Sequence, residues 1–309
     1  MSLTRRNFLT LTGTLGASLA LGCASTTGNG PPSRPTFSIS LAEWSFHRAL
    51  QSGRMTNLDF PVRARREFGI GAVEYVNSFM KDRARDAGYL KELMTRSDGE
   101  GVRSLLIMCD GEGDLGHEDT GARLKAIQNH EKWLDCAAVL GCHSIRVNAG
   151  GRGTRKDVAQ RAADSLVRLA TYADGSRLNV IVENHGGYSS DGSWLAGVMK
   201  IANHPRVGTL PDFGNFALGD NKFYDRYLGV EEMMPFAKAV SAKSHAFNAN
   251  GDESSTNYTR MMGIVLAAGY RGFVGIEYEG DRHSEDDGVR LTKSLLERVR
   301  EDLGSRREE

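Results

Sequence analysis

The chain has 309 residues, 40% of them apolar and 25% charged, which is typical of globular proteins and excludes a disordered or fibrous chain. It carries 39 basic and 39 acidic side chains, so the formal net charge is zero. Nucleic-acid binding usually requires a basic face or stripe, and we therefore expect no nucleic-acid partner.

The first 35 residues have the pattern of an export signal followed by a flexible tether. Arg5 and Arg6 precede Asn-Phe-Leu and a weakly apolar run of small residues, which looks like a twin-arginine signal. The run is too short to predict a membrane span. Cys23 follows Ala-Leu-Gly, in partial resemblance to a lipoprotein cleavage site, so a lipidated Cys23 that tethers the protein to the membrane and ordinary cleavage nearby both fit. We expect a periplasmic protein, with or without this lipid anchor.

From about Phe37 onward, short apolar stretches alternate with longer amphipathic ones. The pattern predicts strands at 37–41, 72–76, 103–109, 144–148, 179–183, 207–212, 239–245 and 272–277. Helical periodicity is clear over 121–140, 155–173, 258–268 and 288–303. Eight strands that alternate with helices favour parallel βαβ units, and residues 36–309 come close to the ~250 residues typical of a (β/α)8 barrel.

A doubly wound sheet is the competing architecture. It would normally carry a glycine-rich phosphate turn after its first strand, whereas "AEWSFHRAL" follows the first strand here. We therefore predict one domain over residues 36–309, an α/β fold with a single (β/α)8 TIM barrel.

The last four predicted strands each end in a polar side chain, at Glu183, Asp212, His245 and Glu277. These positions are roughly 30 residues apart, about one strand–helix unit each, so in a barrel they converge on one face. Taken singly, each has an ordinary explanation as a helix cap or a hydrogen-bonded histidine. Together, three carboxylates and an imidazole favour a bound cation, because the carboxylates would otherwise repel one another. This ligand set suits Mn²⁺, Mg²⁺ or Co²⁺ better than a structural zinc.

The segments "VIVENHGG", "LPDFGN" and "GIEYEG", with support from "GAVEYV" and "SIRVNAGG", resemble the xylose isomerase-like TIM barrels. Within these, the chain is most similar to the sugar isomerase/epimerase branch that contains ketose 3-epimerases. The resemblance extends over the whole chain after the export signal. It is specific for the fold and the metal site, but weakly so for the substrate, because dehydratases, lyases and an endonuclease share the superfamily.

The resemblance implies one divalent metal held by Glu183, Asp212, His245 and Glu277, with Mn²⁺ our first choice and Mg²⁺, Co²⁺ or Zn²⁺ as alternatives. The metal would polarise a sugar carbonyl and stabilise the enediolate formed when the neighbouring C–H proton is removed. Glu183 and Glu277 are the expected base and acid. A leaving group β to the carbonyl would be expelled from the same enediolate, so a lyase or hydratase acting on 3-keto-glycosides is the alternative.

Six further side chains are candidates for substrate binding: Glu74, Arg146, Asn148, His185, His47 and Lys243. Glu74 ends the second strand and could equally cap a helix. His185 departs from the motif of typical ketose epimerases, so their substrate does not carry over directly. Lys243 lies on the same strand face as His245 and is either a pocket cation or a partner that neutralises Asp212.

The expected ligand is a free sugar or an oxidised glycoside. A periplasmic location disfavours phosphorylated sugars, and no segment forms a phosphate-cradling loop. A sugar-binding lipoprotein without catalytic activity is the rival hypothesis from another functional class. An oligomer is compatible with the sequence.

Overall fold

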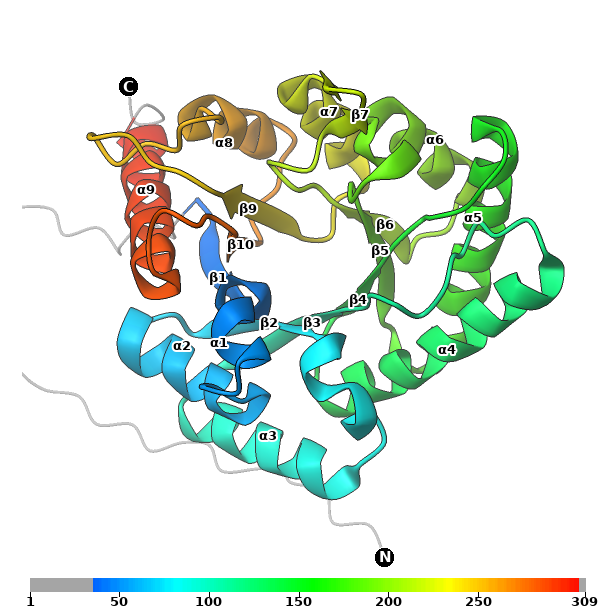
Figure 1. Ribbon diagram of the computed structural model, residues 1–309, viewed down its shortest axis with the longest axis horizontal. Helices are drawn as coiled ribbons and strands as arrows, with labels where there is room; N and C mark the ends of the chain where they lie inside the picture. The colour runs from blue at the N-terminus through cyan, green and yellow to red at the C-terminus, as the bar shows by residue number, and fades with distance from the viewer. Residues whose placement is uncertain (1–35, 306–309) are drawn as a thin grey trace, which may run out of the picture. The chain divides into compact units, whose positions relative to one another are not determined.

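The computed structural model describes residues 36–305, so the expectations for the export signal and for Cys23 lie outside the described residues. Eight strands form one parallel sheet in the order β6-β5-β4-β3-β2-β1-β10-β9 (Figure 1). Their bounds are β1 Ser38–Ala42, β2 Ala72–Val76, β3 Arg103–Met108, β4 Ser144–Val147, β5 Asn179–Glu183, β6 Val207–Leu210, β9 Val240–Ser244 and β10 Phe273–Tyr278.

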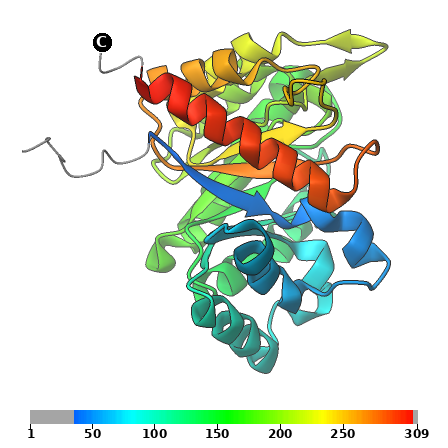
Figure 2. The same cartoon turned by 90° about the vertical axis from the view of Figure 1, so that its left-hand side faces the viewer.

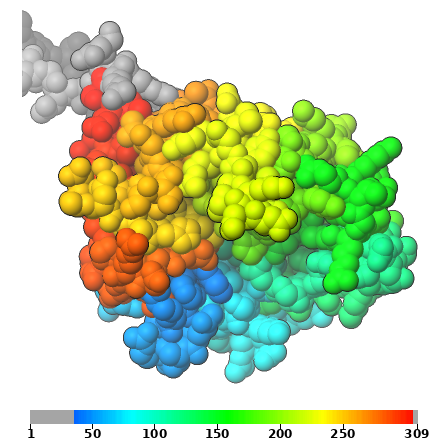
Figure 3. All heavy atoms as spheres, turned by 45° about the horizontal axis from the view of Figure 1, so that its top comes forward, coloured from blue at the N-terminus to red at the C-terminus, as the bar shows by residue number. Residues whose placement is uncertain are grey.

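The sheet curls into a barrel. Leu41 of β1 pairs with Val73 of β2 on one side and with Ile276 of β10 on the other, so the start and the end of the fold are hydrogen-bonded neighbours. Figure 3 shows the same proximity on the surface, where the blue beginning of the barrel lies beside its orange end. Two isolated bridges, Thr209↔Ala237 and Asp212↔Ser241, link the β6 edge to the chain around β9. The predicted (β/α)8 barrel is confirmed.

Helices surround the strands (Figures 1 and 2). They are α1 His47–Gln51, α2 Phe60–Phe68, α3 Ala87–Gly99, α4 Thr120–Val139, α5 Arg155–Tyr172, α6 Gly192–Ala202, α7 Arg226–Met233, α8 Tyr258–Ala267 and α9 Glu285–Ser305. The four helices with clear periodicity in the sequence are confirmed to within a few residues. Helix α6 is rich in apolar residues, most of which are buried. A hairpin of β7 (Ala217–Gly219) and β8 (Lys222–Phe223), which was not predicted, follows β6. Within residues 36–305, no helix combines the length and the apolar character that a membrane span requires.

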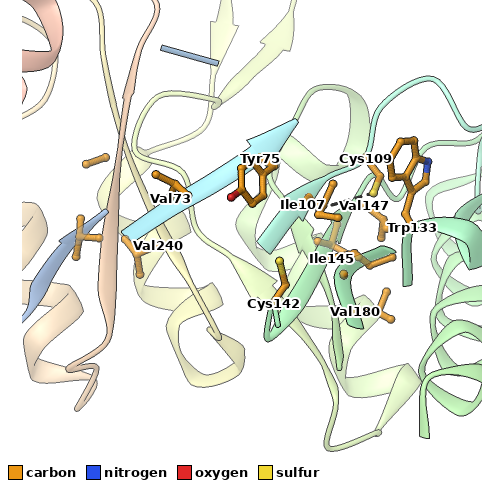
Figure 4. Packing of buried hydrophobic residues seen from close by; sticks show 14 of the residues in the cluster. Val73, Tyr75, Ile107, Cys109, Trp133, Cys142, Ile145, Val147, Val180 and Val240 are labelled. Carbon is orange, nitrogen blue, oxygen red and sulfur yellow. Dashed lines mark hydrogen bonds between the residues drawn. The ribbon is translucent and has the colours of Figure 1, made fainter. Parts of the chain in front are cut away.

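Alternation along the strands divides the apolar residues into two clusters. The larger one packs strands against helices, and Figure 4 shows Trp133 of α4 beside Cys109 and Val147 within it. The smaller cluster comes from the opposite strand face and includes Val76, Met108 and Ile181. Polar residues on that inward face, beyond the small apolar cluster, are therefore held on a rigid platform.

Gly275 of β10 makes room inside the barrel for the buried carboxylate of Glu74. A Cβ at position 275 would lie 2.5 Å from Glu74 Oε1 and 2.7 Å from Glu74 Oε2. We expect Gly275→Ala to lower the free energy of unfolding by about 1–3 kcal/mol, the usual cost of overpacking. In α8, an alanine Cβ at Gly263 would meet nothing within 4 Å, so Gly263→Ala is expected to stabilise by up to ~1 kcal/mol. Urea unfolding measures both, and equal effects would contradict the packing argument.

Candidate active site

Three carboxylates converge at the carboxyl end of the barrel. Glu183 ends β5, Asp212 lies just beyond β6, and Glu277 lies near the end of β10. One ligand atom from each residue lies within 4.8 Å of the others. The residues are 0%, 0% and 3% exposed, respectively. This acidic triad could hold a metal ion, and it consists of three of the four residues expected from the sequence.

The fourth expected ligand, His245, does not join the triad. Strand β9 ends at Ser244, and its register with β10 pairs Glu277 with Lys243. Lys243 therefore lies level with Glu277, while His245 lies two residues farther out along the strand. The imidazole is half-exposed, with its Nε2 3.6 Å from Glu279 Oε2. In the described structure the cluster thus consists of three carboxylates, and the four-ligand set with His245 stays a prediction.

Lys243 brings a buried ammonium to the triad. Its side chain is 1% exposed, and its Nζ lies 3.1 Å from Glu277 Oε1 and 3.2 Å from Glu279 Oε2. Burial by itself would lower the pKa of Lys243, but Glu277, Asp212 and Glu183 together raise that pKa well above its usual value. Lys243 is therefore a permanent cation, and the carboxylates that it contacts directly are Glu277 and Glu279.

Arg146 of β4 brings a second buried cation. Its Nε lies 2.8 Å from Glu183 Oε2, and an Nη donates to Asp110 Oδ1 at 2.7 Å, an oxygen that also accepts from Asn148 Nδ2 at 2.7 Å. The Nε–H is not directed at Glu183, so Oε2 accepts no hydrogen bond from any described residue and the contact is purely ionic. Burial opposes the positive charge, but Glu183 and Asp110 outweigh it and keep the pKa of Arg146 above its usual value.

The triad can hold a proton near neutral pH. Burial raises the pKa of Glu183 to about 7 against the attraction of Arg146, and it raises the pKa of Asp212 to about 7 against that of Lys243. Ser241 Oγ lies 2.7 Å from Asp212 Oδ2 and 3.0 Å from Glu277 Oε2. The Ser241 hydroxyl has one hydrogen and can donate it to only one of these two carboxylates. The contact with the other is favourable only when that carboxyl is protonated and donates its own hydrogen to Ser241 Oγ. Asp212, Ser241 and Glu277 therefore form a short path for a proton.

Asn215, a residue that the sequence analysis did not single out, bridges the acid and the cation. Its Nδ2 donates to Glu183 Oε1 at 2.9 Å, and its Oδ1 accepts from Lys243 Nζ at 3.4 Å. Asn215 is half-buried in the loop after β6 and shares the backbone turn of Asp212, whose Oδ1 accepts from the Asn215 N–H at 2.8 Å. The segment "LPDFGN" contains this residue, but only the loop geometry shows that its amide lies over the cluster.

Glu74 lies inside the barrel and caps no helix. It is 1% exposed, accepts a 2.6 Å hydrogen bond from Ser40 Oγ, and its Oε2 has no donor among the described residues. Burial raises the pKa of Glu74 to about 7, with the charges of Glu277 and Glu183 adding to the effect.

The remaining candidates lie around the rim of the cluster. His47 Nδ1 lies 2.8 Å from the Trp44 carbonyl oxygen, and the two rings stack with their centroids 5.0 Å apart. Trp44 Nε1 donates to Glu279. His185 is exposed beyond β5, and its backbone N–H donates to Ser189 Oγ at 2.9 Å. Trp44 and His47 thus form a stacked aromatic pair beside Glu279 that a sugar could contact.

Comparison with known proteins establishes the family. Residues 62–301 match the family model described as "Xylose isomerase-like TIM barrel". The chain belongs to this family. No curated protein matches the sequence.

Solved structures share the family fold at low sequence identity. One is an IOLI protein with a bound zinc atom (TM-score 0.67, 12% identity, covering 86% of this chain and 99% of the other). A second is a xylose isomerase-like TIM barrel protein from Mycobacterium smegmatis in complex with magnesium (TM-score 0.66, 16% identity, covering 86% of this chain and 97% of the other). A third is a D-psicose 3-epimerase crystallised in the presence of D-fructose (TM-score 0.62, 12% identity, covering 85% of this chain and 99% of the other). At these identities the likeness shows the fold alone.

The donor atoms of the cluster decide whether the expected divalent metal fits this chain. The triad favours an ion, since a buried acidic triad of this kind could hold one and Glu183 Oε2 accepts no hydrogen bond from the described residues. However, His245 turns to Glu279, and the Lys243 ammonium lies 3.1 Å from Glu277. A metal ion bound to Glu277 would lie close to this ammonium, and the two positive charges would repel each other strongly in a buried site. The four-ligand divalent site expected from the sequence therefore does not fit the cluster as it stands.

Proposed function

We propose that this protein is a sugar isomerase or epimerase that transfers a proton at the carbon next to a carbonyl. The observation that carries the proposal is the amide of Asn215, which accepts from Lys243 and donates to Glu183. An α-hydroxycarbonyl presents the same pair of groups, a carbonyl oxygen that accepts and a neighbouring O–H that donates. A sugar that displaces this amide would direct its carbonyl to a cation and its adjacent carbon to a carboxylate.

The proposed reaction begins with the carbonyl oxygen accepting a hydrogen bond from Lys243. Glu183 then takes the proton of the adjacent C–H bond, and the electron pair of that bond forms the enediolate, whose negative oxygen the Lys243 ammonium stabilises. The pKa of Glu183, about 7, suits a base that works near neutral pH. Glu277 receives a proton from Asp212 through the Ser241 hydroxyl and returns it to carbon. Return to the other face of the same carbon gives an epimer. Return to the neighbouring carbon gives an isomer, provided that the proton of the adjacent hydroxyl moves to the former carbonyl oxygen as the new carbonyl forms.

The positive charge beside the carbonyl has two proposed sources. The sequence predicts a divalent metal, with Mn²⁺ as the first choice, and this stays a prediction. The described residues supply the Lys243 ammonium and the Arg146 guanidinium, and the Lys243 ammonium is the cation that acts in the proposed reaction. The candidate substrate contacts are the rim residues Asn148, His185 and His47, together with the buried Glu74 and Arg146.

The proposed location is the periplasm, reached by the twin-arginine route with or without lipidation of Cys23. Free sugars or oxidised glycosides are the substrates that this location favours. Fractionation of cells that express the full chain tests the proposal. Replacement of Arg5 and Arg6 by lysine should retain the protein in the cytoplasm.

Incubation of residues 36–309 with a panel of ketoses and 3-keto-glycosides, with and without Mn²⁺, tests the activity. Chromatography and mass spectrometry identify the products. A product of unchanged mass supports isomerisation or epimerisation, whereas release of the aglycone from a 3-keto-glycoside would replace the proposal by the lyase hypothesis. Ligand binding without any product across the panel would support the sugar-binding protein instead.

A further inference from the structure

We propose that the ammonium of Lys243 takes the place of a divalent metal in this cluster, so that the site works without a metal ion. This inference rests on the proposed function for its catalytic part. Its structural part, that the triad of Glu183, Asp212 and Glu277 binds no divalent metal while Lys243 is present, stands independently.

The position of Lys243 is built into the fold. Register with β10 fixes it beside Glu277, and its side chain runs past Gly214, where an added Cβ would lie 3.1 Å from both Cγ and Cδ of Lys243. Gly214 precedes Asn215 in the loop that covers the cluster. A side chain at position 214 would therefore crowd the lysine, which would have to shift by a few tenths of an ångström.

The hydrogen-bonding capacity of Lys243 matches its surroundings. An ammonium has three N–H donors, and three acceptors surround Nζ: Glu277 Oε1 at 3.1 Å, Glu279 Oε2 at 3.2 Å and Asn215 Oδ1 at 3.4 Å. Two of these acceptors are carboxylates that hold the ammonium in place. The third is the amide that a substrate carbonyl would replace, so one donor becomes available to the substrate without breaking either ion pair.

The triad oxygens are also largely engaged by the chain itself. Asp212 Oδ1 accepts from the backbone N–H groups of Gly214 and Asn215, and its Oδ2 contacts Ser241. Glu277 is held by Ser241 and Lys243. A metal would have to displace these donors, and oxygen ligands at about 2.0–2.6 Å from the ion would place it close to the ammonium.

Metal binding to the purified protein tests the inference without any activity assay. Residues 36–309 are stripped with a chelator and titrated with MnCl₂ or ZnCl₂, with binding followed by calorimetry, bound metal by elemental analysis and stability by Tm. We expect the wild type to retain substoichiometric metal and to show no shift in Tm. Lys243→Ala frees the triad and should bind one metal ion, with Tm rising by roughly 5 °C at a hundredfold excess over Kd.

Two control variants isolate the charge at position 243. Lys243→Arg keeps a cation in the cluster and should resemble the wild type, and Lys200→Ala, which removes an exposed lysine from α6, should also bind no metal. One tightly bound metal ion in the wild type would overturn the inference, and this arm decides even if Lys243→Ala does not fold. If no sugar is turned over, the proposed function fails while the metal titration still judges the role of Lys243.

The catalytic part is judged once a substrate is known. Wild-type kcat/KM should be unchanged after chelation, whereas loss of activity that Mn²⁺ restores would contradict a metal-free site. Lys243→Ala should lower kcat by at least about 100-fold, the usual effect of removing one group that stabilises an oxyanion.

Discussion

Replacement of Glu183 by glutamine is expected to lower kcat/KM by about 10²–10⁴-fold, because the amide cannot take a proton from carbon. Glutamine preserves the shape of the side chain and can still pair with Asn215, so substrate binding should change far less than kcat. Steady-state kinetics on the substrate found in the panel measures the effect. Glu301→Gln, on an exposed face of α9, is the matched control and should leave kcat/KM unchanged.

The pH profile of the wild type supplies a second readout of the same group. Glu183 must be ionised to act as the base, whereas Asp212 must hold the proton that Glu277 returns, and the pKa of each is about 7. The plot of kcat/KM against pH should therefore be bell-shaped, with its maximum near pH 7. Glu277→Gln should also remove most of the activity, since this residue returns the proton. Full activity in Glu277→Gln would contradict the two-carboxylate mechanism.

Replacement of Glu74 by glutamine is expected to stabilise the protein at pH 8 by about 3 kcal/mol and to have little effect near pH 4.5. The folded-state pKa of Glu74 is about 7, whereas an unfolded glutamate titrates near 4.3. Between these pH values the folded protein binds a proton that the unfolded chain does not. The contribution of this group to stability is therefore complete at low pH and is lost as pH rises through about 7.

A glutamine amide at position 74 stays neutral and avoids that loss. The position of Glu74 Oε2 accepts no hydrogen bond from the described residues, so an NH₂ placed there breaks none, while the other oxygen still accepts from Ser40. Urea unfolding of both proteins at pH 4.5 and pH 8 measures the difference. A difference of the same size at both pH values would show that the buried charge is not its cause.

The strand positions could be read from the sequence with little error. The runs "AVEYV" and "NVIVE" are β2 and β5 to the residue, because continuous β-branched and apolar runs mark strands buried on both faces. The spacing of the predicted strands also placed Glu183, Asp212 and Glu277 at the same end of the barrel. Local patterns alone were therefore sufficient for the fold and for the three carboxylates of the cluster.

The contacts within the cluster could not be read in this way. The sequence marks where β9 lies, but which of its inward residues is level with Glu277 depends on the register between two strands. That register brings Lys243 to the triad in place of His245. Asn215 was missed for a related reason, because the path of the loop after β6 determines where its amide points.

Uptake of solvent deuterium tests the central claim that this cluster transfers a proton next to a carbonyl. Wild-type protein and Glu183→Gln are incubated with the substrate in D₂O at pH 8, and NMR locates any deuterium. The account predicts deuterium in the wild-type product at the carbon beside the carbonyl, with uptake at least about 100-fold slower in Glu183→Gln. Conversion of the sugar without deuterium at that carbon, or equal uptake by both proteins, would contradict it.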